Sequence, residues 1–116
     1  MEPKKFDLEE RTTAFGKQIV IFCKKLPKNN INLRLIPQVI GSAGSIGANY
    51  REANDSLGKK DFVHRLKIAR KESKEVSHWL VLLEAAHPEF TGEVALLSKE
   101  AKELTNILSA IIKKFL

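Results

Sequence analysis

Three glycines lie within seven residues, at Gly41, Gly44 and Gly47, in a segment that keeps a helical spacing. Each glycine costs about 1 kcal/mol relative to alanine in a helix interior. The apolar positions nevertheless continue through the segment in steps of three and four, at Ile36, Ile40, Ala43, Gly47, Tyr50, Ala53 and Leu57. A helix that accepts such poor helix formers indicates that another backbone lies close to it. We therefore expect Gly41–Ala53 to belong to a closely packed inner helix of an α-helical bundle.

Length and composition predict one domain. The chain has 116 residues, of which 43% are apolar, enough for a single core. Its longest apolar block, Trp79–Leu83, is far shorter than the ~18–20 residues of a membrane span, and no apolar segment of a signal peptide follows Met1–Lys5. Cys23 is the only cysteine, which excludes an internal disulfide and fits a reducing cytoplasm.

Apolar periodicity predicts four helices and no strand, at about residues 8–25, 33–54, 57–86 and 91–115. We expect Asn32 to cap the second helix, Pro37 to lie in its first turn, and Thr91 to cap the fourth. The expected core includes one apolar line from each helix and the aromatic residues Phe15, Phe22, Phe62 and Phe115. Short links between long amphipathic helices are typical of an all-α, up-down-up-down antiparallel four-helix bundle.

A basic stripe follows the third helix. It lies roughly 200° around the helix from the core line and consists of Lys60, His64, Lys67, Lys71, Lys74 and His78. The net charge of +6 also favours contact with a polyanion, although an ordinary solvated face is the alternative. The candidate nucleic-acid-binding residues are Lys60, His64, Lys67, Arg70, Lys71 and Lys74. Arg70, Lys17, Lys24, Lys25 and Lys28 would extend the stripe if the helices that carry them are adjacent. No aromatic residue alternates with these lysines, so binding should favour the phosphate backbone over base sequence.

A second group of residues is predicted to pack helices together or to form an interface between subunits. Its members are Gly41, Gly44, Gly47, Ala48, Tyr50, Arg51, Glu72, Glu75 and Trp79. Small residues permit close helix approach, within the bundle or between subunits. Arg51 is expected to meet Glu72 and Glu75, within or across subunits, because such charges can specify register and partner choice.

Three catalytic or cofactor interpretations compete with these assignments and fit less well. The glycine spacing differs from that of phosphate-binding loops, and no strand precedes it. Glu75 and His78 have the Glu-x-x-His spacing of di-iron bundles, but only one such pair exists. Glu72 and Glu75 lack a nearby nucleophile for acid–base chemistry. We therefore predict no catalytic residue, no metal and no cofactor, and a protein that is not an enzyme.

Several motifs in order resemble one known family over about residues 6–85. They are Ser42-Ala43, the string Ser-Ile-Gly-Ala-Asn-Tyr-Arg-Glu-Ala at residues 45–53, Lys60-Asp61-Phe62, Ile68-Ala69 with Glu72 and Glu75, and Trp79-Leu80. These look like the small four-helix-bundle proteins encoded by intervening sequences in bacterial 23S ribosomal RNA genes. The resemblance implies a ring-like homopentamer with suspected nucleic-acid binding and no established catalysis. That family is in turn similar to the accessory proteins of diversity-generating retroelements, which work with a reverse transcriptase and RNA.

Two functions are therefore carried forward. The first is a cytoplasmic homo-oligomer that binds nucleic acid, structured RNA in particular, through the basic surface. The alternative is a protein-binding scaffold or accessory subunit that makes no direct contact with nucleic acid.

Overall fold

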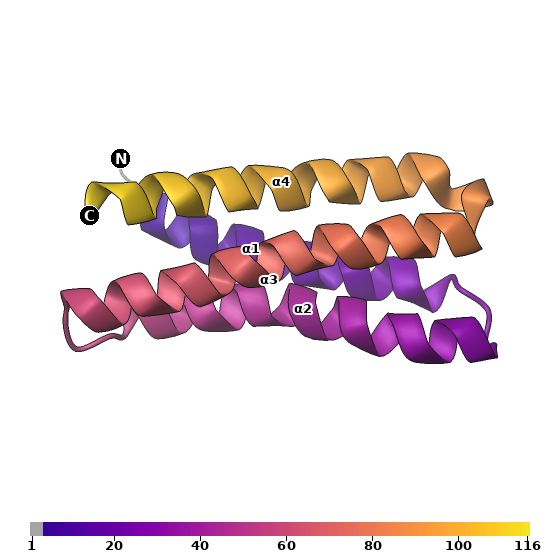
Figure 1. Ribbon diagram of the computed structural model, residues 1–116, viewed down its shortest axis with the longest axis horizontal. Helices are drawn as coiled ribbons and strands as arrows, with labels where there is room; N and C mark the ends of the chain where they lie inside the picture. Colours follow the sequence, from indigo (N-terminus) through magenta and orange to yellow (C-terminus); the bar gives the residue numbers. More distant parts are fainter. Residues whose placement is uncertain (1–3) are drawn as a thin grey trace.

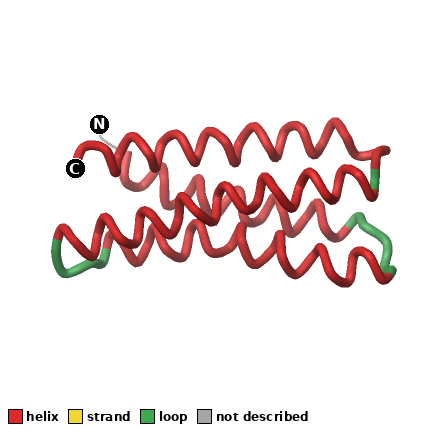
Figure 2. The backbone as a smooth tube through the Cα atoms, in the orientation of Figure 1, coloured by secondary structure: helices red, strands yellow, loops and turns green. Residues whose placement is uncertain are grey.

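The structure is a computed structural model that describes residues 4–116, with side chains from Leu8 onward. Its helices are α1 (Lys4–Lys24), α2 (Asn30–Asn54), α3 (Lys59–Ala86) and α4 (Thr91–Lys114), with a short 3₁₀ helix, η1 (Pro88–Phe90), before α4. Successive long helices run antiparallel, so α1 begins and α4 ends at the same end of the bundle (Figure 1). Loops join the helices, and the described residues contain no strand (Figure 2). The predicted all-α up-down bundle is confirmed.

The order of helices around the bundle decides which surfaces adjoin one another. α2 and α3 share the most extensive contact, followed by α3 with α4 and α1 with α2. α1 and α4 approach each other least among the neighbouring pairs, and α1 lies diagonally opposite α3. The molecule is elongated, with principal extents of 44 × 27 × 20 Å.

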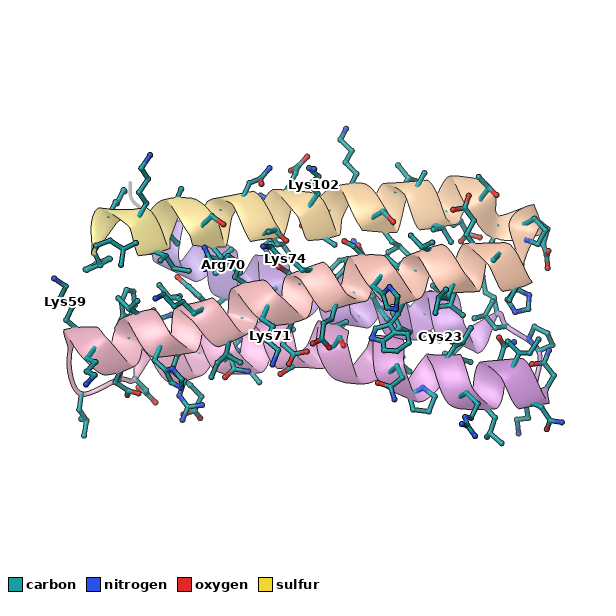
Figure 3. The ribbon with its side chains drawn as sticks, viewed as in Figure 1. Cys23, Lys59, Arg70, Lys71, Lys74 and Lys102 are labelled. Carbon is teal, nitrogen blue, oxygen red and sulfur yellow. The ribbon has the colours of Figure 1, made fainter. Side chains whose placement is uncertain are left out.

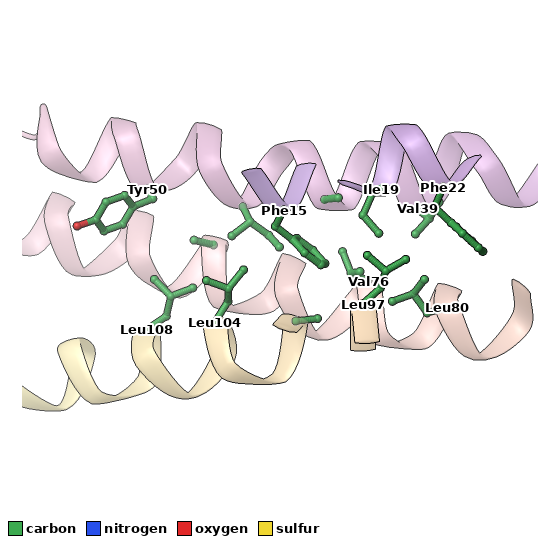
Figure 4. Close-up of a cluster of buried hydrophobic side chains, with 14 of the residues drawn as sticks. Phe15, Ile19, Phe22, Val39, Tyr50, Val76, Leu80, Leu97, Leu104 and Leu108 are labelled. Atoms are coloured by element: carbon green, nitrogen blue, oxygen red, sulfur yellow. The ribbon is translucent and has the colours of Figure 1, made fainter. Parts of the chain in front are cut away.

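Each helix contributes one apolar line to the core. The predicted line of α1 is buried throughout, from Leu8 through Phe15 and Ile19 to Leu26. Figure 4 shows side chains from all four helices meeting in the interior. The labelled ones are Phe15, Ile19, Phe22, Val39, Tyr50, Val76, Leu80, Leu97, Leu104 and Leu108. Burial of such side chains is the main stabilising contribution, at about 1.5–3 kcal/mol each.

The predicted core is wrong at the helix ends. Leu57 is fully exposed because it lies in the turn between α2 and α3, where the helical spacing no longer applies. Phe115 follows the end of α4 and is 37% exposed, although its ring packs edge-on against Phe62 with the centroids 5.1 Å apart. Within α2, Ile36 and Ile40 are only half-buried, and Val39, which the predicted line does not include, is buried at this point of the helix.

Asn32 holds two chain connections together and does not cap α2. The cap is Asn29, whose side chain accepts a hydrogen bond from the Asn32 N–H at 2.8 Å. Asn32 is buried, and its Nδ2 donates to the Pro27 carbonyl at 2.7 Å. Its Oδ1 therefore accepts from Nε2 of the buried His87, 2.9 Å away. The α1–α2 and α3–α4 connections are thus linked at one end of the bundle.

The other helix boundaries differ slightly from those predicted. α1 begins at Lys4 instead of near Leu8, and α3 begins at Lys59 instead of Leu57. Thr91 starts α4 but does not cap it, because its hydroxyl donates to the Pro88 carbonyl at 2.8 Å. No helix in the described part of the chain combines the length and apolar character that crossing a bilayer requires.

Pro37 lies inside α2, beyond the first turn where we expected it, because the helix already begins at Asn30. Proline has no N–H, so the Leu33 carbonyl lacks its intrahelical partner. Leu33 and Pro37 are both exposed, so this part of α2 lies at the surface. The helix therefore tolerates the proline but loses stability.

We expect Pro37→Ala to raise the free energy of unfolding by about 1–2 kcal/mol, since the restored hydrogen bond outweighs the greater freedom of the unfolded chain. Urea denaturation followed by circular dichroism measures the change. Pro88→Ala is the control, because Pro88 begins η1 and displaces no helical hydrogen bond. A Pro37→Ala variant no more stable than the parent would contradict this account.

Candidate nucleic-acid interface

The basic stripe lies on the solvent side of α3. Its lysines and histidines, Lys60, His64, Lys67, Lys71, Lys74 and His78, are all exposed. The opposite face of α3 carries Leu66, Ala69, Ser73, Val76, Leu80 and Leu83, which are buried. Charges therefore recur along one line at intervals of about one helical turn, ~5 Å.

The stripe lysines form no ion pair within the described protomer, although Glu72 lies near Lys71, and Glu75 lines one depression with Lys67, Lys71 and Lys74. Ion pairs in the described structure join Arg11 of α1 to Glu100 and Glu103 of α4, and Lys25, just after α1, to Glu93 of α4. Others join Arg51 to Glu9 and Arg65 to Asp61. None of the stripe lysines takes part in an ion pair among the residues described, so their charge is available to an external anion.

The extension of the stripe differs from the prediction. Lys17, Lys24 and Lys28 belong to α1 and its loop, on the helix diagonally opposite α3, and Lys25 is paired with Glu93. The neighbouring cation is instead Lys102 of α4, which lines the same surface groove as Lys74. Figure 3 shows Arg70, Lys74 and Lys102 on the α3 and α4 part of the surface. Lys102 was missed because its relevance depends on which helix flanks α3.

Two residues of the predicted interface group pack within the protomer. Gly47 and Tyr50 are buried. A Cβ at Gly47 would lie 3.2 Å from the Thr12 hydroxyl oxygen, so α1 and α2 come very close at this point. Burial raises the pKa of the Tyr50 hydroxyl. The expected close helix approach is therefore present at Gly47.

Gly41, Gly44 and Ala48 have a different environment. All three are exposed, and a Cβ at Gly41 or Gly44 would meet nothing within 4 Å. Packing within the protomer therefore does not explain these two glycines. An interface between subunits remains the prediction for this face of α2.

Alanine substitution separates the two kinds of glycine. Gly44→Ala should raise the free energy of unfolding by about 0.5–1 kcal/mol through helix propensity alone. Gly47→Ala should gain less or lose stability, because Thr12 must move away from the new methyl group. Chemical denaturation of both variants tests this. Equal gains would contradict the tight contact at Gly47, and sedimentation of Gly44→Ala reports separately whether an assembly weakens.

Arg51 does not meet Glu72 or Glu75 within the protomer, contrary to one form of the prediction. Its guanidinium donates to Glu9 Oε1 at 3.1 Å and to the Thr13 hydroxyl at 3.2 Å. The physical reason is that Arg51 lies on the side of α2 that faces α1. Contact with Glu72 or Glu75 of another subunit stays a prediction.

Glu72, Glu75 and Trp79 form a partly covered polar group on α3. Burial raises the pKa of Glu72 above its ordinary value near 4.5, and the neighbouring Glu75 adds to this, although Lys71 and Ser42 act in the opposite direction. The Trp79 indole nitrogen is buried and has no acceptor among the described residues. These three residues lie on partly covered positions of one helix.

A pH-dependent stability difference follows for Glu72. Its folded-state pKa is raised, so the folded protein loses stability as pH rises above ~4.5 and the carboxyl ionises. Glu72→Gln should therefore be more stable than the parent at pH 7 and no different well below pH 4. Urea titrations at both pH values measure this. Glu75→Gln should give a smaller gain at pH 7, and a destabilised Glu72→Gln at pH 7 would contradict the assignment.

The described part of the chain contains no cluster of side chains suited to bind a metal ion or to act in nucleophilic catalysis. No group of three His, Cys, Asp or Glu side chains converges there. Cys23 is buried, which raises the pKa of its thiol to about 11 and keeps it protonated at neutral pH.

The fold and this surface define a small antiparallel four-helix bundle with an exposed lysine stripe on one helix. The chain matches the family model of the 23S rRNA-intervening sequence protein over residues 4–110 and belongs to that family. It is also similar to the crystal structure of a protein with unknown function from the S23 ribosomal protein family of Bacteroides thetaiotaomicron VPI-5482. The two are 30% identical, with a TM-score of 0.87, covering 95% of this chain and 98% of the other. The comparison with curated proteins finds no match.

Proposed function

We propose that this protein is a non-enzymatic, cytoplasmic homo-oligomer that binds structured RNA through the basic surface of α3. The observation that carries the proposal is the row of exposed lysines that form no ion pair within the described protomer. Lysine ammonium groups bind phosphate as point charges and release counterions from the nucleic acid. Membership of a family named for intervening sequences of 23S rRNA supports RNA as the polyanion.

Assembly would multiply the effect of a weak site. The family resemblance implies a pentamer, and five chains at +6 each carry about +30. Repeated patches raise the effective concentration of each site for a long ligand, so modest contacts give strong retention. The exposed glycines of α2 and Trp79, whose indole nitrogen has no acceptor among the described residues, supply a surface that a second subunit could cover.

Charge reversal of the stripe tests the proposal. The triple variant Lys67→Glu, Lys71→Glu, Lys74→Glu should lose retention of structured RNA at low salt, while sedimentation shows an unchanged assembly. For the parent protein, the logarithm of the association constant should fall linearly with the logarithm of the salt concentration. The slope should be about −0.7 to −0.9 for each phosphate contact. Fluorescence anisotropy over a series of salt concentrations measures both.

A matched control carries the same change in charge elsewhere. Lys17→Glu, Lys24→Glu, Lys28→Glu alters exposed lysines of α1 and its loop, away from α3. This variant should keep most of the affinity. Equal loss in both variants would contradict a site on α3, and a parent that binds no structured RNA at low salt would exclude RNA binding.

One observation favours the protein-binding alternative. Ile21 and Leu96 are 59% and 70% exposed and line one depression between α1 and α4. Exposed apolar groups that adjoin one another are typical of a surface that meets another protein. Ile21→Ser with Leu96→Ser would weaken protein partners but leave RNA affinity unchanged, which separates the two functions.

A further inference from the structure

A groove with two lysines and several hydroxyl groups lies between α3 and α4. It has a volume of about 590 Å³ and is lined by Lys74, Ser77 and Val81 of α3 and by Ser98, Lys102, Thr105, Asn106 and Ser109 of α4. The positions from Ser98 to Ser109 extend over roughly 16 Å of helix, which is long enough for more than one phosphate group. The groove adjoins the basic stripe, since Lys74 belongs to both.

No carboxylate lines this groove. The acidic residues of α4 face α1, where Glu100 and Glu103 bind Arg11 at 2.7 and 2.6 Å, and Glu93 pairs with Lys25. On α3, Glu72 lies beside Ser42 of α2. Lys74 and Lys102 therefore face a surface whose remaining polar groups are uncharged.

Thr105, one of the lining residues, already has hydrogen-bond partners within the protein. The hydroxyls of Ser73 and Thr105 are 2.6 Å apart, and each lies within donating distance of a main-chain carbonyl, Ser73 of Arg70 at 2.7 Å and Thr105 of Ala101 at 2.9 Å. Ser77, Ser98 and Ser109 also line the groove and are half-exposed. Their hydroxyls make no hydrogen bond with the described part of the chain, so they are free to donate to a ligand and to accept from it.

This combination of groups matches the backbone of RNA. Lysines supply the charge that phosphates require, and serine hydroxyls can pair with the ribose 2′-hydroxyl, which is itself donor and acceptor. A DNA backbone offers the phosphates alone. No aromatic side chain lines the groove, so stacking on bases is absent from this site.

We infer that the groove holds the ribose–phosphate backbone of an RNA strand, with Lys74 and Lys102 on phosphates and Ser77, Ser98 and Ser109 on 2′-hydroxyls. The inference rests on the proposed function and adds to it a preference for RNA over DNA. The expected preference is about tenfold, the effect of roughly two neutral hydrogen bonds.

The test compares an RNA stem-loop with the DNA stem-loop of the same sequence by fluorescence anisotropy at one fixed salt concentration. The parent should bind the RNA about tenfold more tightly. Ser77→Ala with Ser98→Ala and Ser109→Ala should remove the preference by weakening RNA binding alone, because the net charge is unchanged. Alanine is a better helix former than serine, so the variant should keep its fold, which circular dichroism verifies.

Two further variants complete the design. Lys102→Gln should weaken RNA and DNA binding by the same factor and reduce the salt slope, whereas Ser56→Ala, in the turn between α2 and α3, should change nothing. Equal affinity of the parent for RNA and DNA, or a preference that survives the triple serine substitution, would overturn the groove assignment but leave nucleic-acid binding intact. Unchanged binding in Lys102→Gln would also overturn it. Absence of binding to either stem-loop would overturn this inference together with the proposed function.

Discussion

Ion pairs between α1 and α4 determine which surface of the bundle carries free positive charge. These two helices have the smallest contact of the four neighbouring pairs, and Arg11 compensates by binding Glu100 and Glu103. Lys25 pairs with Glu93 at the other end of the same seam. The carboxylates of α4 are thereby concentrated on the α1 side. The opposite side of α4, which faces α3, keeps its lysine and its hydroxyl groups but no acid.

The same arrangement explains why α3 carries the candidate interface. α3 is flanked by α2 and α4, which cover its core face, so that its exposed side carries the basic stripe and, near its end, Val81 and Leu82. Lysines dominate that stripe, and beside it the hydroxyls of the buried Ser73 and the half-buried Thr105 meet between α3 and α4. A stripe on an isolated helix would be an ordinary solvated face. Here the stripe borders a groove with free hydroxyl groups, so the surface offers hydrogen-bond donors and acceptors in addition to positive charge.

Much of the fold could be predicted from the sequence because helical periodicity is local information. The apolar line of α1 is buried as predicted, and the close approach at Gly47 is present. The wrong predictions concern residues whose role depends on contacts with another part of the chain. Asn32 is a good capping residue by type, yet its role depends on His87, 55 positions later in the chain. The partner of Arg51, Glu9 of α1, depends on how the helices are placed around the bundle, which the sequence of α2 alone does not specify.

The candidate site was predictable on α3 and not on α4. Six exposed positions of one helix follow from spacing alone, whereas the partnership of Lys74 with Lys102 depends on the order of helices around the bundle. That order also places the lysines of α1 away from the basic stripe of α3. Under the proposed function, one charged helix and one groove with hydroxyls would recognise backbone chemistry in place of base identity, since they offer donors for phosphate and ribose but no aromatic platform. Affinity for such a ligand would then come from repetition of the site, so the proposal ties RNA binding to an assembly of subunits.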